Sequence, residues 1–264
     1  MKIGFIGCGN MATAMLKGIL KSGEVEASDM IASAKSDKTR EKIEKELGIR
    51  KADNNAQVVD FADVVFLAVK PQFLEGVLDE IRDSVKAGQI FISIAPGKTL
   101  QWLGERLGEN TKVIRTMPNT PAMVGEGMTA LCVNELVTEE ETALAVKLCD
   151  TFGKTEVIPE HLMDAVVGVS GSSPAYVFMF LEAMADAAVA DGMPRAQAYK
   201  FAAQSVLGSA KLMQETGKHP GELKDMVCSP AGTTIQAVRV LEEKGFRSAV
   251  IEAQTECVKK AKGM

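Results

Sequence analysis

The sequence predicts an α/β fold in its first half and an all-helical second half. Short β-rich runs alternate with helical patterns up to about residue 158, as in sheets built from βαβ units. A glycine-rich turn directly follows the first β-rich run. After Pro159 the strand patterns end and helical patterns continue. These observations predict an N-terminal Rossmann-type doubly wound sheet followed by an all-α C-terminal domain.

The composition excludes several classes of protein. Of the 264 residues, 46% are hydrophobic and 25% are charged, which is typical of a globular protein. The formal net charge is −5 and no basic run occurs, so we expect no nucleic acid and no membrane as partners. The five cysteines form no C-x-x-C pair and only two histidines occur, which indicates a cytoplasmic protein without a structural zinc site. The first apolar run, Ile3–Ile6, is too short for a signal peptide.

Apolar, β-rich runs predict the strands of the first half. The runs at 64–69 and 90–94 are apolar almost throughout, which is typical of parallel strands covered on both faces. The predicted strands are residues 2–6, 30–34, 64–69, 89–94, 112–116 and 128–133, with 155–158 as a further strand.

Helical patterns lie between the predicted strands. They occupy residues 10–21, 38–47, 73–85 and 100–107. Thr138 and Glu141 have the spacing of a capping box, which predicts a further helix that runs through Phe152. In the second half, glycine just after one helical pattern and proline opening the next mark helix ends, as at Gly192 and Pro194. We place the domain boundary near residues 158–163, with a first domain at 1–160 and an all-helical second domain at 161–264.

The helical pattern at 175–190 is apolar on nearly every face. Six bulky apolar residues follow one another from Tyr176 to Leu181. Glu182 and Asp186 interrupt the pattern, whereas a bilayer span needs about 20 uninterrupted apolar residues. Such a helix has to be buried on most of its faces. Burial in a homodimer and burial by neighbouring helices of the same chain are equally good explanations.

The segment Gly7-Cys8-Gly9-Asn10-Met11-Ala12 matches the dinucleotide-binding pattern G-x-G-x-x-A. In that pattern the first glycine makes the tight turn and the second lets a pyrophosphate approach the backbone. The phosphates then bind the free N–H groups at the start of the helix. The predicted strand before the segment and the predicted helix after it favour this interpretation over a tight turn without a ligand.

The end of the second predicted strand indicates which dinucleotide binds. An NAD site usually has Asp or Glu there to bind the ribose 2′-hydroxyl, and this chain has none. Ser33, Lys35, Lys38 and Arg40 instead form a polar, cationic group suited to a 2′-phosphate. For any one of these residues, solvation of the next helix is an equally good explanation. We expect a modest preference for NADPH, with NADH also accepted.

Three further segments have the chemistry of ligand sites. Lys70, which directly follows the predicted strand at 64–69, either bonds a nicotinamide ribose or extends into water. Two turns of small residues, 169–175 and 229–234, lead into helical patterns, where free N–H groups at the helix start can bind a carboxylate. For either turn alone, ordinary capping by Ser or Thr is the favoured explanation.

Taken together, these motifs resemble the pyrroline-5-carboxylate reductase family over essentially the whole chain. The motifs that carry the resemblance are residues 5–11, Ala68-Val69-Lys70-Pro71-Gln72, the loop from Arg115 to Pro121, residues 164–172, and the stretch from His219 to Thr234. The resemblance implies NAD(P)H-dependent reduction of 1-pyrroline-5-carboxylate to L-proline, the last step of proline biosynthesis. It also implies that residues 1–160 form the dinucleotide-binding domain and residues 161–264 the substrate-binding and dimerisation domain. The family's homodimer has interlocked helical domains and is often assembled into a decamer.

The resemblance also implies the site residues. The dinucleotide loop corresponds to Ile6, Gly7, Cys8, Gly9, Asn10 and Met11, and the 2′-phosphate and ribose contacts to Ser33 and Asn55. The nicotinamide contacts correspond to Ala68, Val69, Lys70, Pro71 and Ala95. The substrate pocket corresponds to Glu160, Ser170, Gly171, Ser172, Gly232, Thr233 and Thr234. The chain departs from the family's usual residues at Pro96, Ser173 and Ala231.

Reduction of a cyclic imine requires positioning more than strong acids or bases. A protonated imine is already electrophilic, so the protein mainly has to hold it against the reactive carbon of the nicotinamide. We expect the substrate carboxylate to bind the backbone N–H groups of Gly232 to Thr234. The hydroxyl of Thr234, the expected catalytic residue, then bonds the ring nitrogen as it becomes an amine.

Two other functions fit the sequence less well. β-Hydroxyacid dehydrogenases, which also join a Rossmann half to a helical half, need a lysine on the long helix after a glycine-rich turn. Here the first lysine after that turn is Lys200. A regulatory protein that binds NADP and no substrate would not need the second anion-binding helix start at Thr233.

Overall fold

The computed structural model describes residues 1–263, which divide into two compact units. The first unit contains Met1–Gly171 together with the residues from Val258 on, and the second contains Ser172–Cys257. This division lies later in the chain than the expected boundary near residue 160. The reason is packing: Met163 is buried against Ala130 and Cys132 of the first unit.

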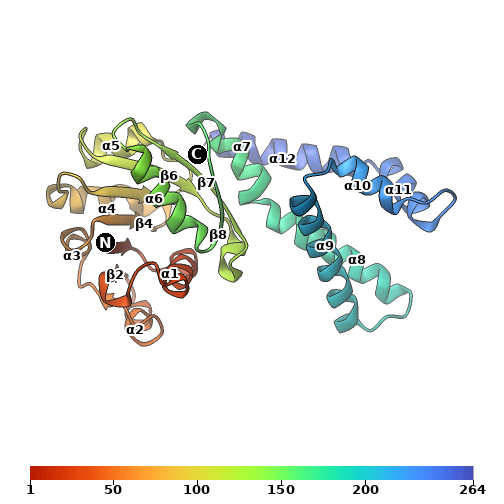
Figure 1. Ribbon diagram of the computed structural model, residues 1–264, viewed down its shortest axis with the longest axis horizontal. Helices are drawn as coiled ribbons and strands as arrows, with labels where there is room; N and C mark the ends of the chain where they lie inside the picture. Colours follow the sequence, from red (N-terminus) through yellow and green to blue (C-terminus); the bar gives the residue numbers. More distant parts are fainter. Residues whose placement is uncertain (264) are drawn as a thin grey trace. The chain divides into compact units, whose positions relative to one another are not determined.

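The first unit is built on an eight-stranded sheet (Figure 1). Its strand order is β3-β2-β1-β4-β5-β6-β7-β8, and the first six positions have the order of a Rossmann fold. The strands are β1 (Ile3–Ile6), β2 (Met30–Ser33), β3 (Arg50–Lys51), β4 (Val64–Leu67), β5 (Ile90–Ser93), β6 (Lys112–Met117), β7 (Gly127–Val133) and β8 (Gly153–Val157). Seven of them confirm the predicted strands to within two residues at each end.

The sheet differs from the prediction at both edges. β7 pairs antiparallel with β6, because a short 3-10 turn, Thr120–Val124, joins them in place of a crossover helix. β8 then pairs parallel with β7. At the other edge the sheet has a further strand, β3, which the sequence does not predict because both of its residues are exposed and form no apolar pattern.

Within residues 1–263, six helices pack against the sheet. They are α1 (Asn10–Ser22), α2 (Asp37–Lys45), α3 (Asn55–Phe61), α4 (Pro71–Ile81), α5 (Leu100–Leu107) and α6 (Glu139–Asp150). The capping box at α6 is confirmed: Thr138 accepts a bond from the Glu141 backbone, and the Glu141 carboxylate accepts one in return. The helix ends at Asp150 and not at Phe152, whose side chain turns into the core.

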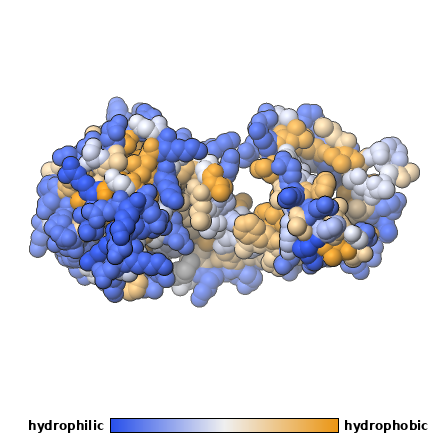
Figure 2. All heavy atoms as spheres, turned by 90° about the horizontal axis from the view of Figure 1, so that it is seen from below, coloured by the Kyte–Doolittle hydropathy of each residue, from blue (hydrophilic) through white to orange (hydrophobic). Residues whose placement is uncertain are grey.

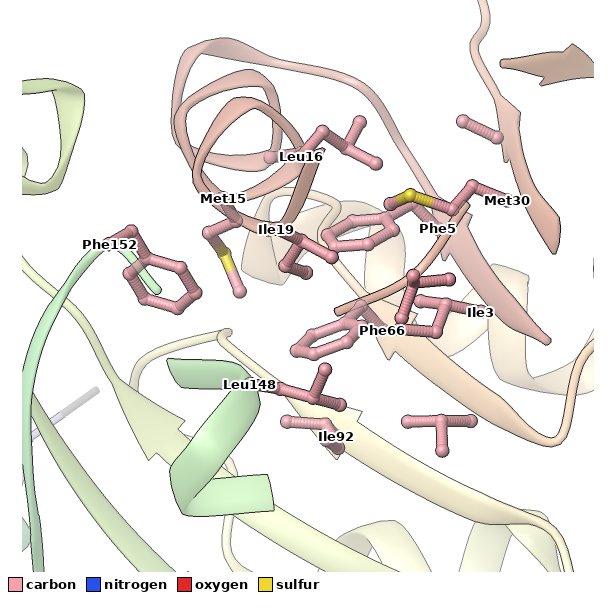
Figure 3. Close-up of a cluster of buried hydrophobic side chains, with 14 of the residues drawn as sticks. Ile3, Phe5, Met15, Leu16, Ile19, Met30, Phe66, Ile92, Leu148 and Phe152 are labelled. Carbon is pink, nitrogen blue, oxygen red and sulfur yellow. The ribbon is translucent and has the colours of Figure 1, made fainter. Parts of the chain in front are cut away.

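Two apolar layers hold these helices against the sheet. One layer includes side chains of α1 and α6 and contains Phe5 and Phe66, whose rings stack with centroids 4.5 Å apart (Figure 3). The other layer packs α3, α4 and α5 through residues such as Val58, Leu78 and Leu103. Because both faces are covered, the central strands are buried throughout.

Short helical turns lead from the sheet to the second unit. They are the 3-10 turn Glu160–Leu162, α7 (Met163–Val166) and the π-helical turn Val167–Gly171. The second unit is entirely helical, as predicted, and contains α8 (Ser173–Ala190), α9 (Arg195–Thr216), α10 (Pro220–Val227), α11 (Thr233–Glu243) and most of α12 (Phe246–Lys262).

The apolar helix α8 is not buried by the rest of the chain. Phe178 is 63% exposed and Met179 is 70% exposed. The stretch Glu160–Ala190 is long and apolar enough to cross a membrane by length and composition alone, and only 11% of its most apolar part is buried. Figure 2 shows apolar residues gathered on the surface, among them many of the helical unit. The explanation in which neighbouring helices of the same chain bury α8 is therefore wrong.

A charge on this exposed face tests whether a second copy covers it. We expect Phe178→Asp to reduce the mass in solution from a dimer or larger to a monomer, because a buried, unpaired carboxylate is costly. Multi-angle light scattering at micromolar concentration measures this. Phe178→Leu keeps the face apolar and should preserve the assembly. An Asp variant with the mass of the wild type would contradict the expectation.

Candidate functional site

The turn between β1 and α1 brings two glycines to the carboxyl ends of the central strands. Gly7 has φ +94°, and a Cβ there would lie 2.7 Å from the carbonyl oxygen of Ala68. Gly9 is the N-cap of α1, so no side chain caps the N–H groups at the start of this helix. A Cβ on Gly9 would meet no atom within 4 Å. The start of α1 therefore opens onto free space, as the fingerprint predicts.

A cavity of about 970 Å³ lies beside this turn. Ligand sites of small molecules typically have about 300–1,000 Å³. Nine predicted cofactor residues line the cavity: Gly7, Cys8, Gly9, Ser33, Lys35, Asn55, Ala68, Val69 and Lys70. The other predicted cofactor residues, Ile6, Asn10, Met11, Pro71 and Ala95, are not among its lining residues, and Ile6 and Ala95 are buried.

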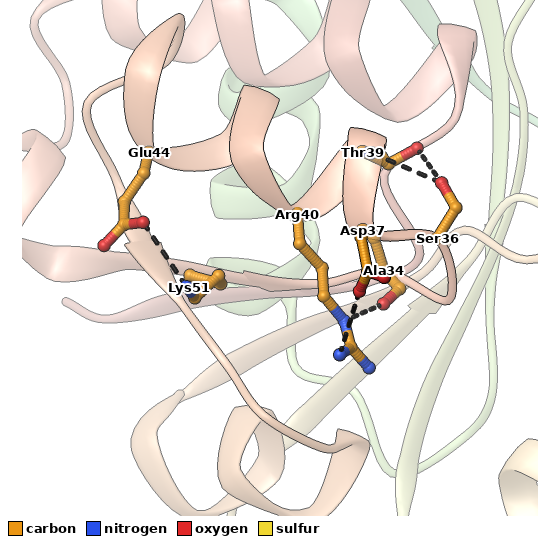
Figure 4. Close-up of polar contacts among 7 residues, drawn as sticks. All are labelled: Ala34, Ser36, Asp37, Thr39, Arg40, Glu44 and Lys51. Carbon is orange, nitrogen blue, oxygen red and sulfur yellow. Dashed lines mark hydrogen bonds and ion pairs between the residues drawn. The ribbon is translucent and has the colours of Figure 1, made fainter.

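The cationic residues after β2 are partly engaged within the chain. The Arg40 Nε donates to the carbonyl of Ala34 at 2.7 Å, and its guanidinium lies 3.7 Å from Asp37 (Figure 4). The Lys35 ammonium lies 5.4 Å from the centroid of the Phe73 ring. Lys35 and Arg40 line the cavity, whereas Lys38 does not. Two cations of the predicted group are therefore placed to meet a phosphate.

Ser33 and Asn55, which line the same cavity as Lys35 and Arg40, are hydrogen-bonded to each other. The Ser33 hydroxyl donates to Asn55 Oδ1 at 2.6 Å. Asn55 Nδ2 donates in turn to Glu80 Oε2 at 2.7 Å. Asn55 opens α3, a seven-residue helix that is not among the predicted helices. The sequence does contain a signal for this helix. Asn54 is a typical N-cap residue, and its side chain accepts a bond from the backbone N–H of Gln57, directly before two buried valines.

Cys8 is one of the residues that line the cavity, and its thiol is uncharged. Burial raises the pKa of Cys8, while a bond to Thr13 and the charge of Lys42 oppose that shift. The thiol thus stays protonated near neutral pH, where a thiolate would repel a pyrophosphate.

Glu160, predicted in the substrate pocket, makes structural bonds within the first unit. Its Oε1 accepts from the Leu100 backbone at 2.7 Å and from Arg115 Nη1 at 3.0 Å. The Arg115 side chain is only 8% exposed, so it needs this counter-charge. Both residues line a smaller cavity of about 370 Å³ with Gly97, Thr99, His161, Asp164, Ala261 and Lys262. Whether Glu160 also contacts substrate stays a prediction.

The first of the two predicted carboxylate-binding turns contains the point of the chain where the first unit ends. Ser170 and Gly171 end the first unit and Ser172 begins the second. The Ser170 carbonyl accepts a bond from Asn119 Nδ2 at 3.0 Å, which fixes the backbone of the turn.

The other turn opens α11 in the second unit. Its N-cap is Gly232, and no side chain caps the helix, so the first N–H groups, including those of Thr233 and Thr234, lack a side-chain partner. Ala231 has φ +58°, the only positive φ at a non-glycine position among residues 1–263. An alanine is strained in this conformation, by about 1–2 kcal/mol.

Comparison with known proteins identifies the family. A family model described as "Pyrroline-5-carboxylate reductase dimerisation" matches residues 160–264, and one described as "NADP oxidoreductase coenzyme F420-dependent" matches residues 2–97. The chain is 56% identical to a pyrroline-5-carboxylate reductase of Escherichia coli, over 98% of this chain and 97% of that protein. The chain belongs to the pyrroline-5-carboxylate reductase family.

Solved structures of pyrroline-5-carboxylate reductases have the same fold. The enzyme of Coxiella burnetii superposes with a TM-score of 0.93 at 34% identity and covers 99% of this chain and 97% of its own. The enzyme of Plasmodium falciparum, solved with NADP bound, has a TM-score of 0.89 at 28% identity, with 100% and 97% covered. The α/β and all-α arrangement of this chain is thus that of the reductase family.

The first unit has the features that a nicotinamide dinucleotide requires. The free space at Gly9 and the uncapped start of α1 suit a pyrophosphate. Ser33, Lys35, Asn55 and Lys70 line the same cavity, Ser33 as the last residue of β2 and Lys70 as the N-cap of α4. The residues present therefore fit the cofactor that the family uses.

Alanine at the two glycines separates folding from cofactor binding. We expect Gly9→Ala to keep the stability of the wild type, because its Cβ meets no atom, but to weaken NADPH binding at least about tenfold by occupying the pyrophosphate space. Fluorescence titration and thermal unfolding measure the two effects.

Gly7→Ala serves as the contrasting variant. Its Cβ would clash with the Ala68 carbonyl and its φ is positive, so it should lower the melting temperature as well. Unchanged NADPH binding by Gly9→Ala would show that the pyrophosphate does not approach this turn.

Proposed function

We propose that this chain reduces 1-pyrroline-5-carboxylate to L-proline with NAD(P)H, the last step of proline biosynthesis. The observation that carries the proposal is the 56% identity, over nearly the whole chain, to the reductase of Escherichia coli. The cavity at the start of α1, with its predicted cofactor residues, supports it. The absence of lysine from α8 argues against a β-hydroxyacid dehydrogenase.

In this proposal the chain acts chiefly by positioning its ligands. When bound, the nicotinamide supplies the hydride. The N–H groups at the start of α1 hold the pyrophosphate, and Lys70 bonds the nicotinamide ribose. The first N–H groups of α11, at Thr233 and Thr234, hold the substrate carboxylate.

Thr234 carries the polar contact to the reacting ring. Its hydroxyl both donates and accepts, so it can remain bonded to the ring nitrogen as the imine becomes an amine. Because a protonated imine is already electrophilic, this bond orients the ring and needs no strong acid. This assigns Thr234 as the catalytic residue.

Several finer properties belong to the same proposal. We propose that NADPH is preferred modestly over NADH, since no carboxylate ends β2 and Lys35 and Arg40 line the cavity. We also propose a cytoplasmic homodimer that assembles further into a decamer, with neither nucleic acid nor membrane as a partner. The exposed apolar face of α8 supports the dimer.

The activity is tested with the purified protein, NADPH and 1-pyrroline-5-carboxylate. NADPH absorbance should fall only when the imine is added, and proline should appear in equal amount. We expect Thr234→Ala to lower kcat about tenfold, because one hydrogen bond at the reacting ring is lost. Thr234→Ser keeps the hydroxyl and should stay near the wild type. Turnover of β-hydroxyacids but not of the imine would refute the proposal.

The cofactor preference is tested by kcat/KM for NADPH and for NADH. We expect Lys35→Ala to lower the NADPH-to-NADH ratio by about fivefold or less, since exposed charge pairs contribute under about 1 kcal/mol. Lys38→Ala removes the same charge outside the cavity and should leave the ratio unchanged. A wild type equally efficient with both cofactors would contradict the preference.

A further inference from the structure

A chain of hydrogen bonds connects the ribose end of the cavity to a carboxylate on α4. The Ser33 hydroxyl donates to Asn55 Oδ1 at 2.6 Å, and Asn55 Nδ2 donates to Glu80 Oε2 at 2.7 Å. The Asn55 backbone N–H also points to Glu80, at 3.4 Å from Oε1. All three residues line the cavity and belong to the first unit.

The carboxylate determines which way the Asn55 amide points. A carboxylate only accepts hydrogen bonds, so the amide nitrogen of Asn55 has to face Glu80. The amide oxygen therefore faces Ser33. Since that oxygen only accepts, Ser33 has to donate its single hydroxyl proton to it. Glu80 thus controls the direction of both bonds.

This arrangement leaves Ser33 as an acceptor toward the cavity. A ribose 2′-hydroxyl can donate to the lone pairs of its oxygen. A 2′-phosphate presents acceptors only and carries nearly two negative charges. To bond it, Ser33 would have to withdraw its proton from Asn55. A flip of the Asn55 amide to compensate would place its oxygen against the carboxylate of Glu80.

We propose that Glu80 is a specificity-determining residue that favours the dinucleotide with a free 2′-hydroxyl. It acts through Asn55 on Ser33, and so opposes the preference for NADPH that Lys35 and Arg40 create. The inference rests on the proposed function in one respect, namely that this cavity binds a nicotinamide dinucleotide. It gives a physical reason for the preference that we propose to be modest in size.

The test uses two nucleotides that occupy the adenosine end alone. Adenosine 2′,5′-bisphosphate and 5′-AMP are titrated into the full chain by calorimetry. In Glu80→Gln the new amide can donate to Asn55, so the Asn55 amide can flip and free the Ser33 proton for the phosphate. We expect the affinity for the bisphosphate to rise about tenfold relative to that for 5′-AMP, the gain of one charge-assisted bond.

Three further variants separate the hydrogen-bond mechanism from simple charge. Asp83→Asn removes a nearby carboxylate that does not line the cavity, and should leave the ratio of affinities unchanged. Glu80→Ala should shift the ratio in the same direction as Glu80→Gln. In Ser33→Ala, the added Glu80→Gln change should have no effect, because the acceptor it acts on is gone. The kcat/KM ratio for NADPH over NADH should follow the affinities.

Two results would overturn the inference. One is a Glu80→Gln variant whose ratio equals that of Asp83→Asn. The other is a Glu80→Gln effect that persists in the Ser33→Ala background. If the wild type binds neither nucleotide, the proposed cofactor cavity is itself wrong and the inference fails with it. If the protein binds both nucleotides but Glu80→Gln leaves the ratio of their affinities unchanged, the inference about Glu80 is overturned and the proposed cofactor cavity stands.

Discussion

The close contact between the β1–α1 turn and the end of β4 constrains the rest of the first unit. Gly7 has no side chain and a positive φ, so its backbone can turn close to the Ala68 carbonyl. A Cβ added at Gly7 would lie only 2.7 Å from that carbonyl oxygen. The Gly7 N–H bonds the Ser33 carbonyl at 3.2 Å, and the Ala68 N–H bonds the Ile6 carbonyl at 2.9 Å. Three strand ends are thereby joined at one point. Their side chains and the start of α1 necessarily share one cavity.

Most of this fold can be predicted because burial leaves a pattern in the sequence. The central strands are covered on both faces and are apolar throughout, so their runs are unmistakable. β3 escapes prediction because two exposed residues carry no pattern. The reversal at β7 depends on the connection Thr120–Val124, whose short length shows only in the structure. The long helices of the second unit follow from their glycine and proline ends.

The sequence predicts residues of the site only where they are neighbours along the chain. The loop from Gly7 to Asn10 follows from a motif, and Lys35 follows from the end of a predicted strand. Asn55 follows from the family resemblance, and the capping residue Asn54 is the local signal for the helix that it opens. Glu80 escapes because it lies 25 positions from Asn55, on a helix with ordinary surface residues. Hydrogen bonds between distant residues need the folded backbone to be known first.

The return of α12 to the first unit affects the order in which the protein folds on the ribosome. The helix begins in the helical unit, yet its last turns belong with the sheet, where Ala261 is buried beside the ion pair of Arg115 and Glu160. Residues 258–263 follow the whole helical unit along the chain. The sheet can pair its strands as they emerge, but the face beside Arg115 stays uncovered until the helical unit has been synthesised. A fragment that stops after β8 would lack that cover permanently, so the first unit matures fully only when the chain continues through the helical unit.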